Sequence, residues 1–249
     1  MPGVVFATPR TMPDSRDVVI DVRGVQKDYH GLRPLRVRHL EVHAGESVAL
    51  LGFDQAAAEV LVNLITAATV PDAGSVRAFG QLTTAIQDAE TWLHSLDRFG
   101  ILSERAVVLD NMTVEQNLTM PVTMALHDVP EDVRSKIHAL AGEVGLAATQ
   151  LEQPVAVLSP SARLRLRLGR ALGPDPRMLL AEHPNASLPP GDLASFAADY
   201  SRIVSARGIA SIVLTADRAF AAAIASRILT LQPATGELEP LGRWRRWFS

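Results

Sequence analysis

The stretch ESVALLGFDQAAAEVLVNLI, from Glu46 to Ile65, decides the fold. Its first half is a short continuous apolar run, which is typical of a buried strand, and Gly52 ends that run. Its second half places apolar side chains at helical spacing, at Val60, Leu61, Leu64 and Ile65. The sequence therefore predicts a buried strand, a glycine turn and a helix over residues 56–67.

Strands and helices alternate along the rest of the chain. Other strand-like runs are VVIDVRGV, LRVRHLEV, SVRAFG, FGILS, MLLA, IASIVLT and RILTL. Helical patterns are AIQDAETWLHSL, the segment 193–206 and RAFAAAIA. Residues 71–74 have the composition of a turn. This alternation predicts an α/β fold with a mainly parallel sheet.

The middle of the chain, roughly residues 113–151, is mostly helical by pattern. We predict one helix over TVEQNLTMPVTMAL, bent at Pro121, and a second over PEDVRSKIHALAGEVGL. Pro130 precedes the second helix and Gly145 lies near its end, as expected for helix boundaries. The pattern indicates a helical block inserted into the α/β domain.

The segment from Ser159 to Leu172 fits two structures. Its leucines alternate with arginines, which by periodicity predicts an amphipathic strand, at Leu164, Leu166 and Leu168. A helix would instead gather basic side chains on one face, at Arg163, Arg167 and Arg170. The family resemblance given below favours the helix.

Composition excludes several classes of protein. The chain has no cysteine, which excludes disulfides, zinc-thiolate sites and thiol nucleophiles. Its hydrophobic fraction of 47% and charged fraction of 20% predict a folded domain. A net charge of -3 gives no reason to expect nucleic acid as a partner. The N-terminus lacks the pattern of a secretion signal, and the apolar runs are shorter than the roughly 18 residues that span a bilayer.

Five segments carry a resemblance to a known family, in this order: VALLGFDQAAAEVLVNLI, RFGILSERAVVLDNMTVEQNL, VLSPSARLRLRLGRAL, PRMLLAEHPNASLPP and SIVLTADRAFA. Over about residues 18–231 the chain resembles a nucleotide-binding subunit of an ATP-binding cassette (ABC) transporter. The resemblance implies a P-loop NTPase (RecA-like) core, an N-terminal antiparallel β subdomain and an α-helical subdomain over about 104–160. One cassette would span residues 17–242, after an extension over 1–16 and before a tail over 243–249.

The resemblance places the phosphate loop of the family after the first quoted strand. In the family this loop reads glycine, four residues and Gly-Lys-Ser/Thr, which cradle the phosphates and hold Mg²⁺. Gly52 keeps the first glycine position. The second glycine, the lysine and the two hydroxyl positions are replaced, by Ala57, Ala58, Glu59 and Val60.

The other functional positions of the family are also altered. Glu104 occupies the glutamine position of the Q-loop, and the LSGGQ signature becomes Ser159, Pro160 and Ser161. The Mg²⁺-supporting aspartate, the water-activating glutamate, the D-loop aspartate and the switch histidine are replaced by Glu182, His183, Pro189 and Ala216. Tyr29 occupies the position of the aromatic ring that stacks on adenine.

Simpler interpretations exist for several of these residues. His183 is either a base or a histidine at a loop edge, and Glu182 with His183 is an unlikely metal pair because adjacent residues of a strand point to opposite faces. Ser159 is either a nucleotide contact or a helix N-cap. Tyr29 is either an adenine platform or an ordinary aromatic residue after a strand.

The C-terminal tail GRWRRWFS combines aromatic and basic residues, namely Trp244, Trp247 and Phe248 with Arg243, Arg245 and Arg246. This composition suits a membrane surface or an acidic groove. It also suits a solvated tail.

Taken together, the substitutions predict a degenerate cassette, a pseudo-ATPase. The resemblance implies that it docks to an integral membrane subunit and pairs with a second cassette, in the cytoplasm on the inner face of the membrane. We expect no cofactor, although the family uses ATP and Mg²⁺, no resident metal and no nucleic acid partner. The alternatives are a heterodimer with residual ATP binding or hydrolysis at a composite site, and a soluble scaffold that uses the same fold.

Overall fold

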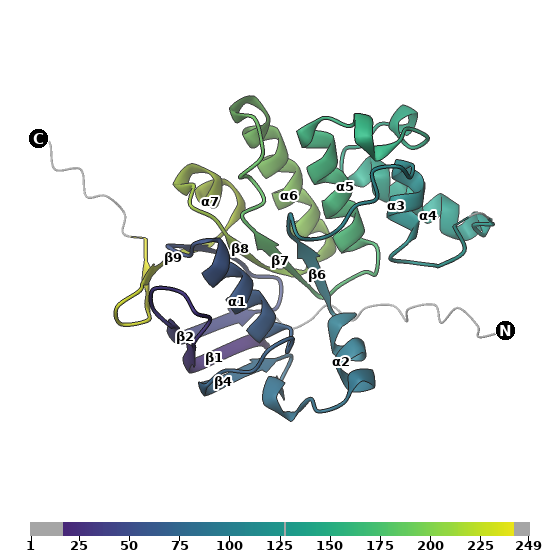
Figure 1. Cartoon of the computed structure of the whole chain (residues 1–249). Helices are drawn as coiled ribbons and strands as arrows, with labels where there is room; N and C mark the ends of the chain where they lie inside the picture. Colours follow the sequence, from purple (N-terminus) through teal and green to yellow (C-terminus); the bar gives the residue numbers. More distant parts are fainter. Residues whose placement is uncertain (1–16, 127, 242–249) are drawn as a thin grey trace, which may run out of the picture.

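The computed structural model describes residues 17–126 and 128–241 (Figure 1). The strands are β1 (Val18–Lys27), β2 (Leu35–His43), β3 (Ser47–Leu51), β4 (Ala73–Ala78), β5 (Gln81–Leu82), β6 (Phe99–Leu102), β7 (Met178–Glu182), β8 (Ala210–Leu214), β9 (Arg227–Gln232) and β10 (Glu237–Pro240). The α-helices are α1 (Gln55–Ile65), α2 (Ala89–Leu96), α3 (Val114–Thr119), α4 (Glu131–Glu143), α5 (Pro160–Leu172), α6 (Leu193–Arg207) and α7 (Arg218–Ile224). The expected extension 1–16 and tail 243–249 lie outside the described residues.

The central sheet has the strand order β10-β9-β3-β8-β7-β6. All its neighbouring strands pair in parallel except β9 and β10, which are antiparallel. Along β7, Met178 and Leu180 enter one hydrophobic core, whereas Leu179 and Ala181 enter another. Both faces of the sheet are therefore covered, which explains the continuous apolar runs. The predicted fold class is confirmed.

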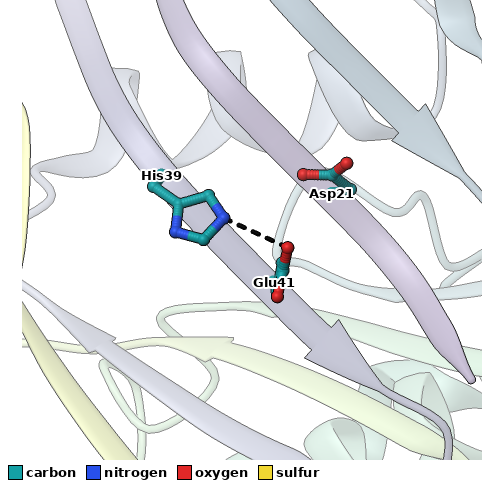
Figure 2. Close-up of side chains that lie close together, drawn as sticks. All are labelled: Asp21, His39 and Glu41. Carbon is teal, nitrogen blue, oxygen red and sulfur yellow. Dashed lines mark ion pairs between the residues drawn. The ribbon is translucent and has the colours of Figure 1, made fainter. Parts of the chain in front are cut away.

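A second, antiparallel sheet has the order β2-β1-β4-β5. Its inner face packs with α1 and the central sheet in one core. On its outer face Asp21 of β1 lies opposite Glu41 of β2, and Arg23 lies opposite His39. Figure 2 shows Asp21, His39 and Glu41 close together on this face. The start of two elements differs from prediction. Strand β4 begins at Ala73, inside the expected turn, and helix α2 begins at Ala89, later than the predicted start at Ala85.

The inserted block is built from α3, α4 and the loops around them, and it packs against α5. The predicted single bent helix over residues 113–126 is wrong: α3 ends at Thr119 instead of continuing through Pro121. Proline lacks the N–H that would continue the helix. Its start is fixed by a reciprocal pair, because Thr113 Oγ1 accepts from the N–H of Gln116 and the Gln116 side chain accepts from the N–H of Thr113.

The alternating segment is the helix α5, so the periodicity in favour of a strand was misleading. Its leucines are all buried, at Leu164, Leu166 and Leu168. This is achieved because α3, α4 and β6 surround the helix. The arginines on either side of these leucines reach polar groups at the edges: Arg163 pairs with Asp110 and Arg170 donates to the Asn117 carbonyl. Within the described ranges, no helix is long and apolar enough to cross a membrane.

Candidate functional site

The turn after β3 is tight because of Gly52. Its φ is +85°, in the left-handed region that favours glycine, and an added Cβ would lie 3.0 Å from the Leu231 carbonyl oxygen. Phe53 next to it is buried in the core below the turn. The chain therefore enters α1 after only two further residues, Phe53 and Asp54.

The N-terminus of α1 is closed by a carboxylate of the chain itself. Asp54 caps the helix: its Oδ1 accepts from the N–H of Ala57 at 2.8 Å, and its carbonyl accepts from the N–H of Ala58 at 2.9 Å. Ala57 and Ala58 are buried under the cap. Because these N–H groups are engaged inside the helix, they are not free to wrap an external anion.

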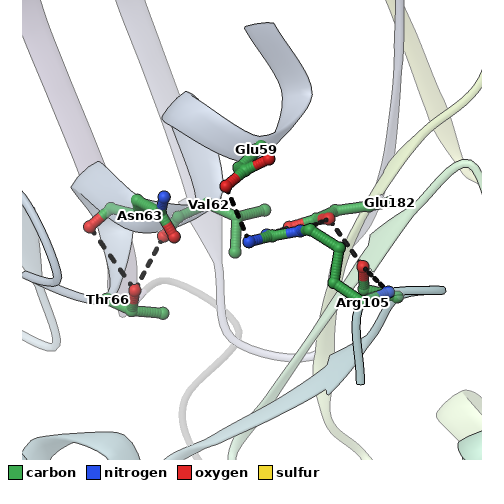
Figure 3. Close-up of polar contacts among 7 residues, drawn as sticks. Glu59, Val62, Asn63, Thr66, Arg105 and Glu182 are labelled. Atoms are coloured by element: carbon green, nitrogen blue, oxygen red, sulfur yellow. Dashed lines mark hydrogen bonds and ion pairs between the residues drawn. The ribbon is translucent and has the colours of Figure 1, made fainter. Parts of the chain in front are cut away.

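A four-residue polar network lies beside this helix (Figure 3). The guanidinium of Arg105 donates to Glu59 Oε1 at 2.9 Å, to Glu182 Oε2 at 3.0 Å and to Glu182 Oε1 at 2.5 Å. The hydroxyl of Ser103 donates to Glu182 Oε2 at 2.8 Å and accepts from the Arg105 N–H at 3.1 Å. The network joins α1, the end of β7 and the segment after β6.

Burial makes the Glu182 side of this network the stronger one. The Glu182 side chain is 0% exposed, whereas those of Arg105 and Glu59 are 39% and 41% exposed. A buried carboxylate needs a paired and hydrogen-bonded counterion, and Arg105 supplies it through two nitrogens. The hydrogen bond to Glu182 also raises the pKa of Arg105, against the opposing effect of desolvation.

The residues after β7 turn sharply. His183 adopts a φ of +43°, which is unusual for a residue other than glycine, while its N–H donates to the Leu214 carbonyl at 2.8 Å. Its Nε2 is buried and has no hydrogen-bond partner within the part of the chain described. Nearby, the Thr215 hydroxyl donates to Asn185 Oδ1 at 2.8 Å. Strain of this kind concentrates at functional sites.

Comparisons with known proteins agree with the fold described above. A model of the family described as ABC transporter matches residues 35–186, more than half of the chain. The chain belongs to the ABC transporter family. It is 30% identical over 216 residues to an uncharacterized ABC transporter ATP-binding protein of Rhizobium meliloti, covering 85% of this chain and 77% of that protein.

Two further matches add to this result. The lipoprotein-releasing system ATP-binding protein LolD of Maricaulis maris is 30% identical and matches over 90% of this chain and 97% of its own length. The dimeric structure of MJ0796, a bacterial ABC transporter cassette, superposes with a TM-score of 0.74 at 21% identity, covering 90% of this chain and 100% of that one. The structural match supports the cassette fold.

The cassette brings only some of the sequence-predicted positions together. Arg105 joins Glu59 and Glu182, and Tyr29 is half-buried near the cap of α1, where burial first and the Asp54 charge second raise its pKa. Val60, the other hydroxyl position, is partly buried against the core. The remaining positions do not join the network.

The residues that the resemblance assigns to the signature lie at the start of α5. Ser159 is its N-cap and accepts from the N–H of Ala162 at 3.2 Å, with Pro160 as the first residue of the helix and Ser161 half-buried after it. Ala216 and Pro189 are both exposed. Each lies outside the network around Arg105.

Sequence reasoning missed Arg105 and Ser103. The resemblance to the family drew attention to Glu104, but Glu104 is exposed and its side chain forms no hydrogen bond or ion pair with the residues described. The neighbouring Arg105 makes the contacts instead. One sequence signal was available. Arg105 is a basic residue next to Glu104, and the chain has acidic residues, Glu59 and Glu182, at positions that by resemblance face Mg²⁺ and phosphate.

The outer cluster of Asp21, His39 and Glu41 has metal-ligating residue types. However, Arg23 donates to both Asp21 oxygens, at 2.8 and 2.9 Å, and to Glu41 Oε1 at 3.0 Å. His39 Nε2 lies 3.2 Å from the same Glu41 oxygen. Since Arg23 already pairs with these carboxylates, a metal ion could bind there only by displacing it.

Proposed function

We propose that this chain is a cassette subunit of an ABC transporter that does not hydrolyse ATP. It docks against an integral membrane subunit and pairs with a second cassette, as a homodimer or a heterodimer, and its role in transport is structural or regulatory. One observation carries the proposal: the Asp54 carboxylate accepts the N–H of Ala57 at the N-terminus of α1, where the family holds phosphate.

The residues of the site do not fit Mg-ATP. Ala58 supplies no positive charge, Glu59 is paired with Arg105, and Glu182 is held by Arg105 and Ser103. A phosphate charge about 4 Å from the Asp54 carboxylate would be repelled by about 4 kcal/mol at an effective dielectric of 20. That is about half the binding free energy of a micromolar ligand. We therefore expect neither ATP nor Mg²⁺ as a cofactor.

The signature end supports the same function. In the family, each ATP lies between the phosphate loop of one cassette and the signature of the other, where backbone N–H groups approach the phosphate. Pro160 has no N–H to donate, and the Ser159 hydroxyl is engaged as the cap of α5. The site that this chain shares with a partner cassette is impaired as well as its own.

The docking part of the proposal rests on the segment from Glu104 to Asn117, which by resemblance lines the groove for the membrane subunit. Val107 in this segment is 70% exposed and so is accessible to a partner. A cavity of about 270 Å³ opens between α3 and α4, and part of its lining belongs to the same segment: Thr113, Glu115, Gln116, Thr119, Leu126, Val129, Arg134 and Glu152. Docking there places the subunit in the cytoplasm, on the inner face of the membrane.

Titration with a fluorescent ATP analogue and Mg²⁺, followed by a phosphate-release assay, tests the proposal. We expect no saturable binding in the micromolar range and equal, background phosphate release from the wild type and the His183→Ala variant. Micromolar binding together with turnover that His183→Ala abolishes would refute an inactive cassette.

A second function is weak ATP hydrolysis at a composite site in a heterodimer. It is favoured by the strained backbone of His183 and its buried, unpartnered Nε2. This function predicts that the chain copurifies with an ATP-competent cassette. It also predicts ATPase activity that falls in the Ser159→Arg variant, in which the larger side chain blocks the signature. An unchanged rate in that variant would leave the inactive cassette as the function.

A further inference from the structure

The guanidinium of Arg105 is a cation supplied by the chain itself, and it lies between α1 and the end of β7. Arg105 contacts carboxylates from two separate elements, Glu59 of α1 and Glu182 at the end of β7, and its own segment follows β6. Ser103 completes the group, with its hydroxyl bonded to Glu182 at 2.8 Å. Figure 3 shows the Arg105 guanidinium lying between the two glutamates.

The group around Arg105 has the composition of a site for a hard divalent cation. Glu59 and Glu182 each supply a carboxylate and Ser103 a hydroxyl, and oxygen ligands of this kind suit Mg²⁺, Mn²⁺ and Ca²⁺. One guanidinium contacts both carboxylates, so the two side chains already share a single organic cation. Removal of Arg105 would take away the positive charge that both carboxylates contact.

We propose that Glu59, Glu182 and Ser103 form a cation site whose permanent occupant is the guanidinium of Arg105, and that a divalent cation binds there once Arg105 is removed. This inference rests on the proposed function, because an inactive cassette has no use for an exchangeable metal. Arg105 thereby determines the specificity of the site by excluding metal ions.

A tethered cation has a mechanical consequence. A bound metal ion holds its ligands together only while it is bound. Arg105 cannot dissociate, because it is covalently part of the segment after β6. The contacts of Arg105 hold α1, the end of β7 and the segment after β6 together. These three parts of the cassette are therefore joined without a nucleotide.

The test compares the full-length wild type with Arg105→Ala, Arg105→Ala/Glu182→Gln and Arg105→Ala/Glu59→Gln. The probe is Mn²⁺ alone, without nucleotide, and the readout is the loss of the free Mn²⁺ signal in electron paramagnetic resonance. The wild type serves as the control for background binding at Asp21, His39 and Glu41, which is the same in all four proteins.

We expect Arg105→Ala to bind one Mn²⁺ per chain more than the wild type, with a Kd at least about tenfold lower than any wild-type binding, because Kd follows the charge of the ligands. Glu182→Gln in that background should abolish the added site, and Glu59→Gln should weaken it. Equal Mn²⁺ binding by Arg105→Ala and the wild type would overturn the proposal.

Folding of the variants is checked by circular dichroism. If Arg105→Ala does not fold, Arg105→Gln replaces it, since glutamine can still donate to Glu182 without a charge. If both need metal to fold, rescue of refolding by Mn²⁺ supports the proposal and failure of rescue overturns it. ATP turnover by the wild type would refute the inactive cassette but leave the Mn²⁺ result independent, because these titrations contain no nucleotide.

Discussion

Replacing Arg105 by alanine should destabilise the protein far more than replacing Glu59 by glutamine. Arg105→Ala leaves the Glu182 carboxylate, 0% exposed, with only the Ser103 hydroxyl as a partner. Breaking a buried ion pair costs about 3–5 kcal/mol, and the 39% exposure of Arg105 places this case at the lower end, about 3 kcal/mol. The contact with Glu59 is exposed on both sides, so its loss costs about 0–1 kcal/mol.

Urea unfolding followed by circular dichroism measures both values, and thermal unfolding provides a second scale. For a domain of this size 1 kcal/mol corresponds to about 2–4 °C in Tm, so we expect Arg105→Ala to lower Tm by about 6–12 °C and Glu59→Gln by at most about 4 °C. Arg105→Ala/Glu182→Gln should recover much of the loss, because no charge remains buried. A double variant as unstable as Arg105→Ala, or equal losses in the two single variants, would contradict the argument.

Three other predictions concern the stability of the folded domain. Asp54→Ala removes the cap of α1 and should lower the free energy of unfolding by about 0.5–2 kcal/mol in urea. Gly52→Ala forces alanine into a left-handed conformation beside a carbonyl oxygen and should cost at least about 1 kcal/mol, measured in the same way. Burial raises the pKa of Tyr200, outweighing its hydrogen bond to Ser211. Its folded pKa is thus above the unfolded value near 10, so this contribution to stability is complete below about pH 10 and is lost as the pH rises further. In absorbance titrations, Tyr200 should ionise only when the protein unfolds.

Much of the fold was predictable because strands buried on both faces have a continuous apolar sequence. In β7 successive residues from Met178 to Ala181 enter opposite cores, so the sequence carries an unbroken apolar run there, and the helices keep their own spacing. Gly52 was predictable for a similar reason, since it ends a buried strand and precedes a helix. These signals are local and belong to single elements.

Periodicity failed where several elements surround one helix. In α5 the alternating leucines Leu164, Leu166 and Leu168 are all buried although they do not share one helical face, because neighbours cover the helix from more than one side. Only the order of the flanking segments predicted a helix there. The end of α3 was missed for a different reason: the apolar pattern continues past Pro121, but the backbone cannot.

Arg105 could not be predicted from single positions because its role depends on two residues that are 46 and 77 positions away. Taken one at a time, Glu59 and Glu182 stand, by resemblance, at positions where the family has a group that serves Mg²⁺ or phosphate. In space both contact the same guanidinium, and in the proposal above the chain's own cation thereby replaces an external one. The proposal predicts that the effects of substitutions on the free energy of unfolding are coupled. Neutralising Glu182 is tolerated only when Arg105 is neutralised too, whereas Glu59, which is exposed and weakly bound, can be neutralised alone.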